Sequence, residues 1–132
     1  MLKELCTYIQ TETDFIIGID LFAGFIPSTA QDDCVVAIEG GGKPNFYLPD
    51  KEEKVVQILS RAKDYWAARN NAKTIFDLLH GKSGIELMYL NTGVPVYILS
   101  TIEAIALPQS VGQDERGLFN ISVNFIIRLQ DK

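Results

Sequence analysis

The sequence predicts an α+β fold, a two-layer sandwich in which an N-terminal helix and one major helix pack on a mixed or antiparallel β-sheet of about four main strands. Three observations support this class. Apolar residues repeat at helical spacing over 2–12 and again over 65–79, and they alternate with polar residues over 119–129. A chain of 132 residues suits one hydrophobic core better than two, so we expect a single domain over 1–132.

The first half of the chain is expected to hold one helix and two strands. The helix over 2–12 carries its apolar stripe on Leu2, Leu5, Cys6 and Ile9. Glycines and a proline punctuate 14–27, which favours an extended connection over a helix. Alternation over 34–39 predicts a strand that ends at the triple glycine, and 54–61 predicts a second strand rich in β-branched residues. Prolines on either side leave 45–48 as a short extended piece.

The second half is expected to hold the major helix and three strands. Asp64 is a suitable N-cap, and Gly81 stands where a left-handed C-terminal cap would end the helix. The stripe of this helix consists of Tyr65, Ala68, Ala72, Ile75, Phe76 and Leu79. A short strand over 84–90 and a long one over 96–107 follow, with Ile98, Ile102, Ala104 and Ala106 predicted on one face of the long strand. The polar connection over 108–117 is expected to be a loop before the final strand.

The composition argues against several classes of protein. With a formal net charge of −5 and a pI of about 4.8, the chain lacks the basic balance of a protein that follows nucleic-acid phosphates, so no sequence-specific nucleic-acid binding is expected. Cys6 and Cys34 are too few for a disulfide framework, and we expect reduced, buried thiols. We expect no signal peptide and no membrane span, because no apolar run is long enough.

The stretch EGGGKPN, residues 39–45, has three glycines followed by a lysine, a combination also found in phosphate-binding loops. A Walker loop ends in Gly-Lys-Ser/Thr and opens a helix. Here Pro44 follows Lys43, and Ala37 occupies the position of the first glycine. We therefore expect the glycines to end a strand and let the chain turn, without binding a nucleotide.

The residues needed for catalysis or metal binding are not found in a recognisable pattern. His80 is the only histidine, and its position predicts a surface or cap residue in the last helical turn. Neither cysteine nor any serine lies in a nucleophile motif. We expect no catalytic, cofactor-binding or metal-binding residues and no cofactor.

Three parts of the chain are candidates for contact with a partner. Trp66 lies just off the apolar stripe, so it is either a core residue or an exposed interface anchor. The charged segment 114–117 is either a solubilising turn or an arm that orders on a partner. Together with a glycine-rich segment at a sheet edge, these give the candidate interface residues Gly41, Gly42, Lys43, Phe46, Tyr47, Trp66, Asp114, Glu115 and Arg116.

An ordered set of short motifs resembles the tail-completion, or minor capsid, proteins of tailed phages, a family that includes tail terminators, head–tail joining proteins and prophage copies. The motifs are D-L-F-x-G-x-x-P at 20–27, E-G-G-G-x-P at 39–44, R-A at 61–62, L-L-x-G at 78–81, D-E-x-G at 114–117 and F-x-x-S-x-N at 119–124. They cover nearly the whole chain in order. Asp20 departs from the pattern, which has Asn at that position.

The resemblance implies a structural, non-enzymatic role in virion assembly. Proteins similar to terminators form hexameric rings that stop polymerisation of the tail tube and join it to the head. The implied partners are further copies of this chain, the tail-tube protein and a head-completion or connector protein. The implied location is the head–tail junction of a virion made in the cytoplasm of a bacterial host.

Two alternatives stay open. The chain could be a minor capsid or head-completion component that does not terminate tails. From a different class, it could be a small-molecule-binding α+β domain that uses the apolar sheet face and the glycine-rich rim.

Overall fold

The computed structural model describes residues 1–44, 51–88 and 95–131. In this part of the chain two helices, α1 (Leu2–Glu12) and α2 (Tyr65–Leu79), accompany seven strands. The strands are β1 (Leu21–Ala23), β2 (Cys34–Pro44), β3 (Lys51–Ala62), β4 (Ser83–Met88), β5 (Pro95–Ala104), β6 (Gln109–Gln113) and β7 (Phe119–Asp131). The α+β class is confirmed, but the expected sheet of about four strands is too small.

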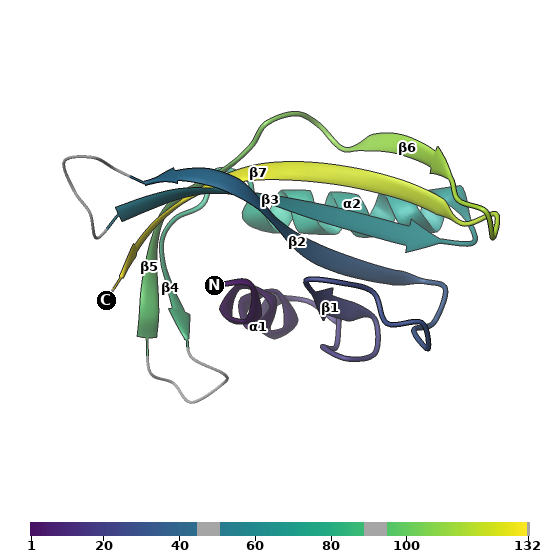
Figure 1. Cartoon of the computed structure of the whole chain (residues 1–132), viewed down its shortest axis with the longest axis horizontal. Coiled ribbons are helices and arrows are strands. Elements are labelled where there is room, and N and C mark those ends of the chain that lie inside the picture. The colour runs from purple at the N-terminus through teal and green to yellow at the C-terminus, as the bar shows by residue number, and fades with distance from the viewer. Residues whose placement is uncertain (45–50, 89–94, 132) are drawn as a thin grey trace.

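The strands form one mixed, curled sheet in the order β1-β2-β3-β7-β5-β4 (Figure 1). Only the pairing of β1 with β2 is parallel; the other pairs are antiparallel. Strand β7 is long enough for two shorter strands to share one of its sides. β6 pairs with its first part, from Phe119 to Ser122, and β5 pairs with its last part, from Phe125 to Asp131.

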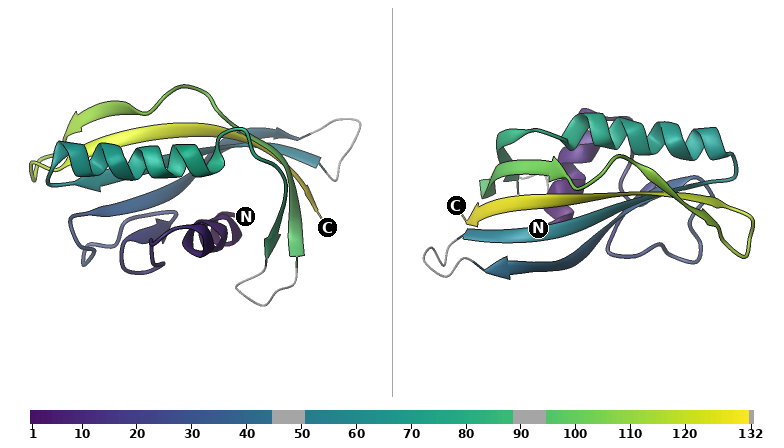
Figure 2. Two further views of the ribbon diagram at one scale, coloured as in Figure 1. Left: turned by 180° about the vertical axis from the view of Figure 1, so that it is seen from behind. Right: turned by 90° about the horizontal axis from the view of Figure 1, so that it is seen from above.

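Both helices pack against the same face of the sheet, and one apolar core joins them to it (Figure 2). Helix α1 contributes Leu5 and Ile9, which are fully buried, and α2 contributes its predicted stripe. The alternation predicted for β7 is confirmed. Its inward residues Ile121, Val123, Phe125, Ile127 and Leu129 are buried, because a strand turns every second side chain toward the helices.

A smaller apolar cluster lies on the opposite face of the sheet. Phe22, Cys34 and Val36 form it, and side chains of the 26–30 connection pack against it. The Arg61 side chain holds the end of this connection, because its guanidinium donates to the carbonyls of Gln31 and Asp32 at 3.0 and 3.1 Å. The sheet is therefore covered on both faces at this end.

The triple glycine does not end its strand. β2 continues to Pro44, and the pairing with β3 shifts between Glu39 and Gly42, where one extra residue forms a bulge. A Cβ on Gly40 would lie 3.1 Å from the carbonyl oxygen of Val55, so close approach of the neighbouring strand explains a glycine there. The prediction of a turn at these glycines is wrong, because glycine is favoured in β-bulges as well as in turns. The extended piece predicted at 45–48 lies outside the described residues.

A second bulge, in β5, changes which side chains of this strand face the core, so the face predicted from the sequence is partly wrong. Leu99 pairs with Leu129 and Thr101 with Arg128, so Ser100 is an extra residue. Leu99 and Ile102 are therefore both buried, whereas Ile98 lies opposite Gln130 and is only partly buried. The placement of Ile102 and Ala104 on the core face is confirmed and that of Ile98 is wrong. Ala106 lies beyond the end of β5 and is exposed.

The two helices agree with the sequence prediction, whereas the two shortest strands, β1 and β6, were not predicted. Asp64 and His80 flank α2 as its caps, Asp64 makes no side-chain capping bond, and Gly81 has the left-handed φ of 79° expected of it. The segment predicted as an extended connection contains β1, and the connection predicted as a loop contains β6. Cys6 and Cys34 are buried free thiols, as expected, and burial raises the pKa of Cys6 to about 12.

Candidate assembly surfaces

Trp66 is an exposed aromatic residue, which decides between the two interpretations of this position. Its neighbour Tyr65 turns toward the sheet and meets the ring of Phe119 edge-to-face, with ring centres 5.7 Å apart. The Trp66 ring meets that of Tyr65 edge-to-face at 5.1 Å and is 67% exposed. Tyr65 therefore supports a large, unburied aromatic surface at the start of α2.

A groove of about 260 Å³ begins at this tryptophan. Trp66 and Phe76 of α2 form one wall, and Leu107 and Pro108 of the β5–β6 connection form the other. Arg69, Asn70 and Lys73 make its polar rim. Leu107 is 73% exposed, so the groove carries apolar side chains that folding leaves in water. We call the seven residues that line it the α2 groove.

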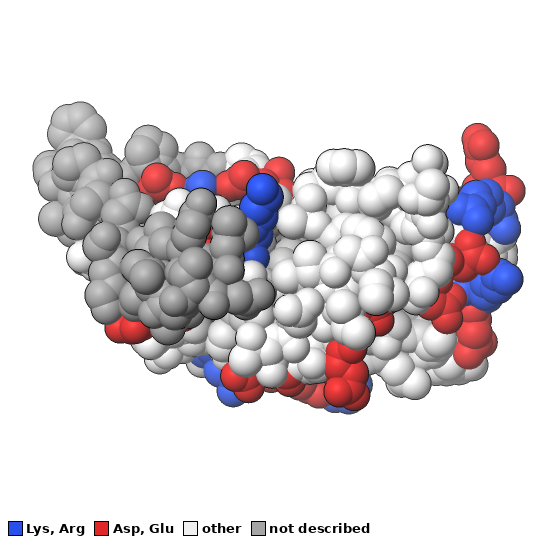
Figure 3. All heavy atoms as spheres, turned by 90° about the horizontal axis from the view of Figure 1, so that it is seen from below, with Lys and Arg blue, Asp and Glu red and all other residues white. Residues whose placement is uncertain are grey.

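A second apolar surface lies on the segment around β1. Ile16, Ile19 and Phe25 are 50, 54 and 70% exposed. The face that holds α1 and this segment has a broad area without charged side chains, which are gathered at its edges (Figure 3). Asp20 orders the turn, because its Oδ1 accepts a hydrogen bond from the backbone N–H of Ile16 at 2.6 Å. The turn is also bound to α1, since the N–H of Ile17 donates to Gln10 Oε1 at 2.8 Å. We call residues 16–25 the 16–25 segment.

The 114–117 loop is bound to the body of the protein. Arg116 Nη2 lies 2.7 Å from Asp32 Oδ1, and Lys63 Nζ lies 3.2 Å from the other oxygen of the same carboxylate. Asp114 Oδ1 accepts hydrogen bonds from the N–H groups of Arg116 and Leu118, at 2.9 and 3.0 Å. The bond from Leu118 is the largest cause of a lowered pKa for Asp114. Glu115, at the tip, is exposed.

The predicted interface residues are not brought together. Gly41, Gly42 and Lys43 lie in the last part of β2, beside the start of β3, and β3 runs from there to the opposite end of β7, where the 114–117 loop lies (Figure 1). Phe46 and Tyr47 lie outside the described residues. Trp66 alone belongs to an apolar groove. The chain therefore presents several separate surfaces and no single predicted site.

Sequence reasoning missed the most exposed apolar residues of both surfaces, Ile16, Ile19, Phe25 and Leu107. One signal was available. Ile16, Ile19 and Phe25 lie in a segment that glycines and a proline prevent from forming a helix or a long strand, and Leu107 directly precedes Pro108. Apolar residues in such segments are candidates for contact with a partner.

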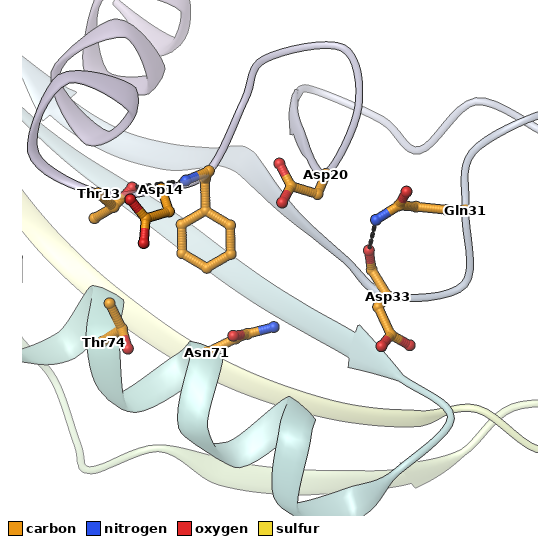
Figure 4. Close-up of a pocket in the computed structure, with 8 residues that line it drawn as sticks. Thr13, Asp14, Asp20, Gln31, Asp33, Asn71 and Thr74 are labelled. Atoms are coloured by element: carbon orange, nitrogen blue, oxygen red, sulfur yellow. Dashed lines mark hydrogen bonds between the residues drawn. The ribbon is translucent and has the colours of Figure 1, made fainter.

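A polar pocket of about 310 Å³ lies between α2 and the connections around β1, as Figure 4 shows. Eight residues line it: Thr13, Asp14, Phe15, Asp20, Gln31, Asp33, Asn71 and Thr74. Two of its carboxylates already accept hydrogen bonds from the backbone. Asp20 accepts from the N–H of Ile16, as described above, and Asp33 accepts from the N–H of Lys63 at 3.2 Å. No group of three or more His, Cys, Asp or Glu side chains suited to a metal occurs among the described residues.

His80 lies at the C-cap of α2, as its sequence position predicts. Its Nδ1 accepts a hydrogen bond from the backbone N–H of Ala104 at 3.0 Å, and its ring stacks on Phe76 with centres 5.0 Å apart. This geometry gives the imidazole a structural partner on β5. The side chain thus fastens the end of the helix to the sheet.

The fold and these surfaces define a small α+β domain that presents exposed apolar patches for contact with other proteins. The chain belongs to the family of bacteriophage tail terminator proteins, whose family model matches residues 8–131. The resemblance in the ordered motifs is thereby confirmed. The family is a structural one, so the chain is a component of a phage virion that contacts other virion proteins.

The fold also occurs in a solved structure from the virion of a native gene transfer agent particle. The two chains superpose with a TM-score of 0.58 at 14% sequence identity, over 96% of this chain and 93% of the other. At this identity the similarity concerns the fold alone. A comparison with curated proteins finds no match. Within the described part of the chain, neither helix has the length and apolar character that crossing a bilayer requires.

Proposed function

We propose that this protein assembles into a hexameric ring that caps the tail tube and joins it to the head. The observation that carries the proposal is the family match, which extends over 8–131 and so includes the second half of α1, all of α2 and the whole sheet in one terminator-like unit. The role is non-enzymatic: the ring acts by blocking further addition of tube subunits and by offering a surface to the head connector.

The surface of the chain supports self-assembly. Soluble monomers rarely leave large apolar side chains grouped in water, and larger patches mark protein–protein contacts. Here Trp66, Leu107 and Phe25 are each about two-thirds exposed or more, on two different parts of the molecule. A ring whose subunits meet head to tail needs two such surfaces on every copy.

The test has a biochemical arm and a functional arm. Light scattering on the purified chain, alone and with tail-tube protein, is expected to give the mass of six copies, and electron microscopy is expected to give rings at tube ends. Phage that lack the gene are expected to make tubes of uncontrolled length, and expression of this chain in trans is expected to restore one length. The partner is included because assembly can depend on it.

The result that contradicts the proposal is equally concrete. A chain that stays monomeric with tube protein present, and whose loss leaves tail length uniform, does not terminate tails. Unchanged tails together with empty or detached heads would instead favour the head-completion role. A small-molecule function would instead be favoured if the protein binds a metabolite in the pocket of Figure 4. In that case Asn71→Ala, in the lining of this pocket, should abolish metabolite binding and leave tails unchanged.

A further inference from the structure

The two apolar surfaces lie on different sides of the molecule. The α2 groove is bounded by Leu107 and Pro108, just before β6, and the 16–25 segment surrounds β1. In Figure 1 and in the left view of Figure 2, β6 and β1 lie at opposite edges of one half of the sheet, with β2, β3 and β7 between them. One partner subunit docked on one side therefore leaves the other surface uncovered.

This arrangement distinguishes two ways in which copies could pair. A two-fold contact uses the same patch on both subunits, so it would bury one surface and leave the other exposed. A head-to-tail contact puts a different patch of each subunit at every interface, and a closed ring then buries both surfaces on all copies. Only the second arrangement accounts for Trp66, Leu107 and Phe25 at once.

The charges beside the two surfaces are of opposite sign. Arg69 lies on the rim of the groove and makes no ion pair with any described residue, and Lys73 beside it pairs with Asp77 at 2.9 Å. Glu12 and Asp14 lie at the end of α1 next to the 16–25 segment, both are exposed, and neither has an ion-pair partner in the part of the chain that the structure describes. Complementary charges favour one register of contact over others.

We infer that the α2 groove of one copy receives the 16–25 segment of the next copy, with Arg69 facing Glu12 or Asp14 of its neighbour. This inference rests on the proposed ring, and it names the two surfaces from which the ring is built. The apolar side chains Ile16, Ile19 and Phe25 enter between α2 and the 107–108 wall. The hydrogen bonds that Asp20 and Gln10 accept hold the turn in place before contact, which limits the ordering that association requires.

The decisive experiment uses two variants with one damaged surface each. Leu107→Asp places a charge in the groove, and Phe25→Asp places one on the segment; both side chains are mostly exposed, so folding is expected to be unaffected. Each variant alone should associate at least ten-fold more weakly than wild type in sedimentation velocity. Mixed in equal amounts, they should form a heterodimer and nothing larger, because only one intact groove and one intact segment remain to meet.

A control and a charge exchange accompany the mixture. Val111→Asp alters another exposed apolar residue, 57% exposed, that lines neither surface, and it should leave self-association within two-fold of wild type. Arg69→Glu should weaken association, and adding Asp14→Lys to the same chain should restore most of the loss. Thermal unfolding of every variant is measured first, so that a misfolded chain is recognised.

Three outcomes overturn the inference: a mixture that yields no heterodimer, loss of association in only one of the two variants, and absence of self-association by wild type with or without tube protein. The functional arm separates this failure from failure of the proposed role. If both variants still restore uniform tail length in trans, the interface is wrong and the terminator role stands. If wild type does not restore it, the role itself is wrong.

Discussion

The bulge in β5 predicts very different consequences for two adjacent apolar residues. Leu99 has no exposed surface and pairs with Leu129 in the main core, whereas Ile98 points to the other face opposite Gln130. We compare Leu99→Ala with Ile98→Ala. Without the bulge, regular alternation from Ile102 would put Ile98 in the core and Leu99 outside, so the pair tests the bulge directly.

The expected magnitudes follow from burial. Truncation of a fully buried leucine to alanine costs about 2–5 kcal/mol, because transfer energy is lost and a cavity remains. Ile98 is partly exposed and belongs to neither apolar cluster, so about 1 kcal/mol or less is expected for Ile98→Ala. With a urea m-value of about 1.5–2 kcal/mol/M, a cost of about 3 kcal/mol lowers the midpoint by about 1.5–2 M.

The assay is urea unfolding followed by far-ultraviolet circular dichroism at one fixed protein concentration, since self-association would otherwise shift the midpoints. The midpoint of Leu99→Ala should fall by at least twice as much as that of Ile98→Ala. Equal shifts, or a larger shift for Ile98→Ala, would refute the bulge and restore the regular alternation. Ser100→Ala is the matched control and should change stability little, because this residue is exposed.

Three further predictions concern the charged end and the thiols. Arg116→Glu removes the ion pair with Asp32 and should lower stability by about 0.5–1 kcal/mol in thermal unfolding, while Glu115→Lys should not; equal melting temperatures for both would contradict this. Asp114 should titrate in an NMR experiment below the usual range of aspartate, so that its loop stays closed above the ordinary pKa and opens only as pH falls through the lowered value. Cys6, with a pKa of about 12, should resist alkylation in the native protein at pH 8 and react once urea unfolds it.

The prediction for Arg116 illustrates a change that the structure requires. From the sequence alone, the 114–117 loop is either a solubilising turn or an arm that orders on a partner. The contact with Asp32 makes it part of the folded domain, so a charge reversal there affects stability as well as any interface. Assembly defects of Arg116→Glu can be attributed to an interface only after its stability has been measured.

Local patterns in the sequence were sufficient for the long elements. Helices α1 and α2 and strand β7 each repeat their apolar residues with one period over ten residues or more, and such a repeat has one structural solution. The lone His80, the two buried thiols and the family were likewise accessible from residue types and motif order. These features follow from residue type, local spacing and the order of motifs along the chain.

Only the tertiary structure decided the features that depend on a neighbour. Whether glycines at 40–42 turn the chain or bulge it depends on the register against β3, and whether Leu99 or Ile98 is buried depends on the register against β7. The short strand β6 exists because the first part of β7 offers it an unpaired edge. The exposure of Trp66 and Leu107, and the groove they share, arise because α2 and the 107–108 connection meet in space although they are distant in sequence.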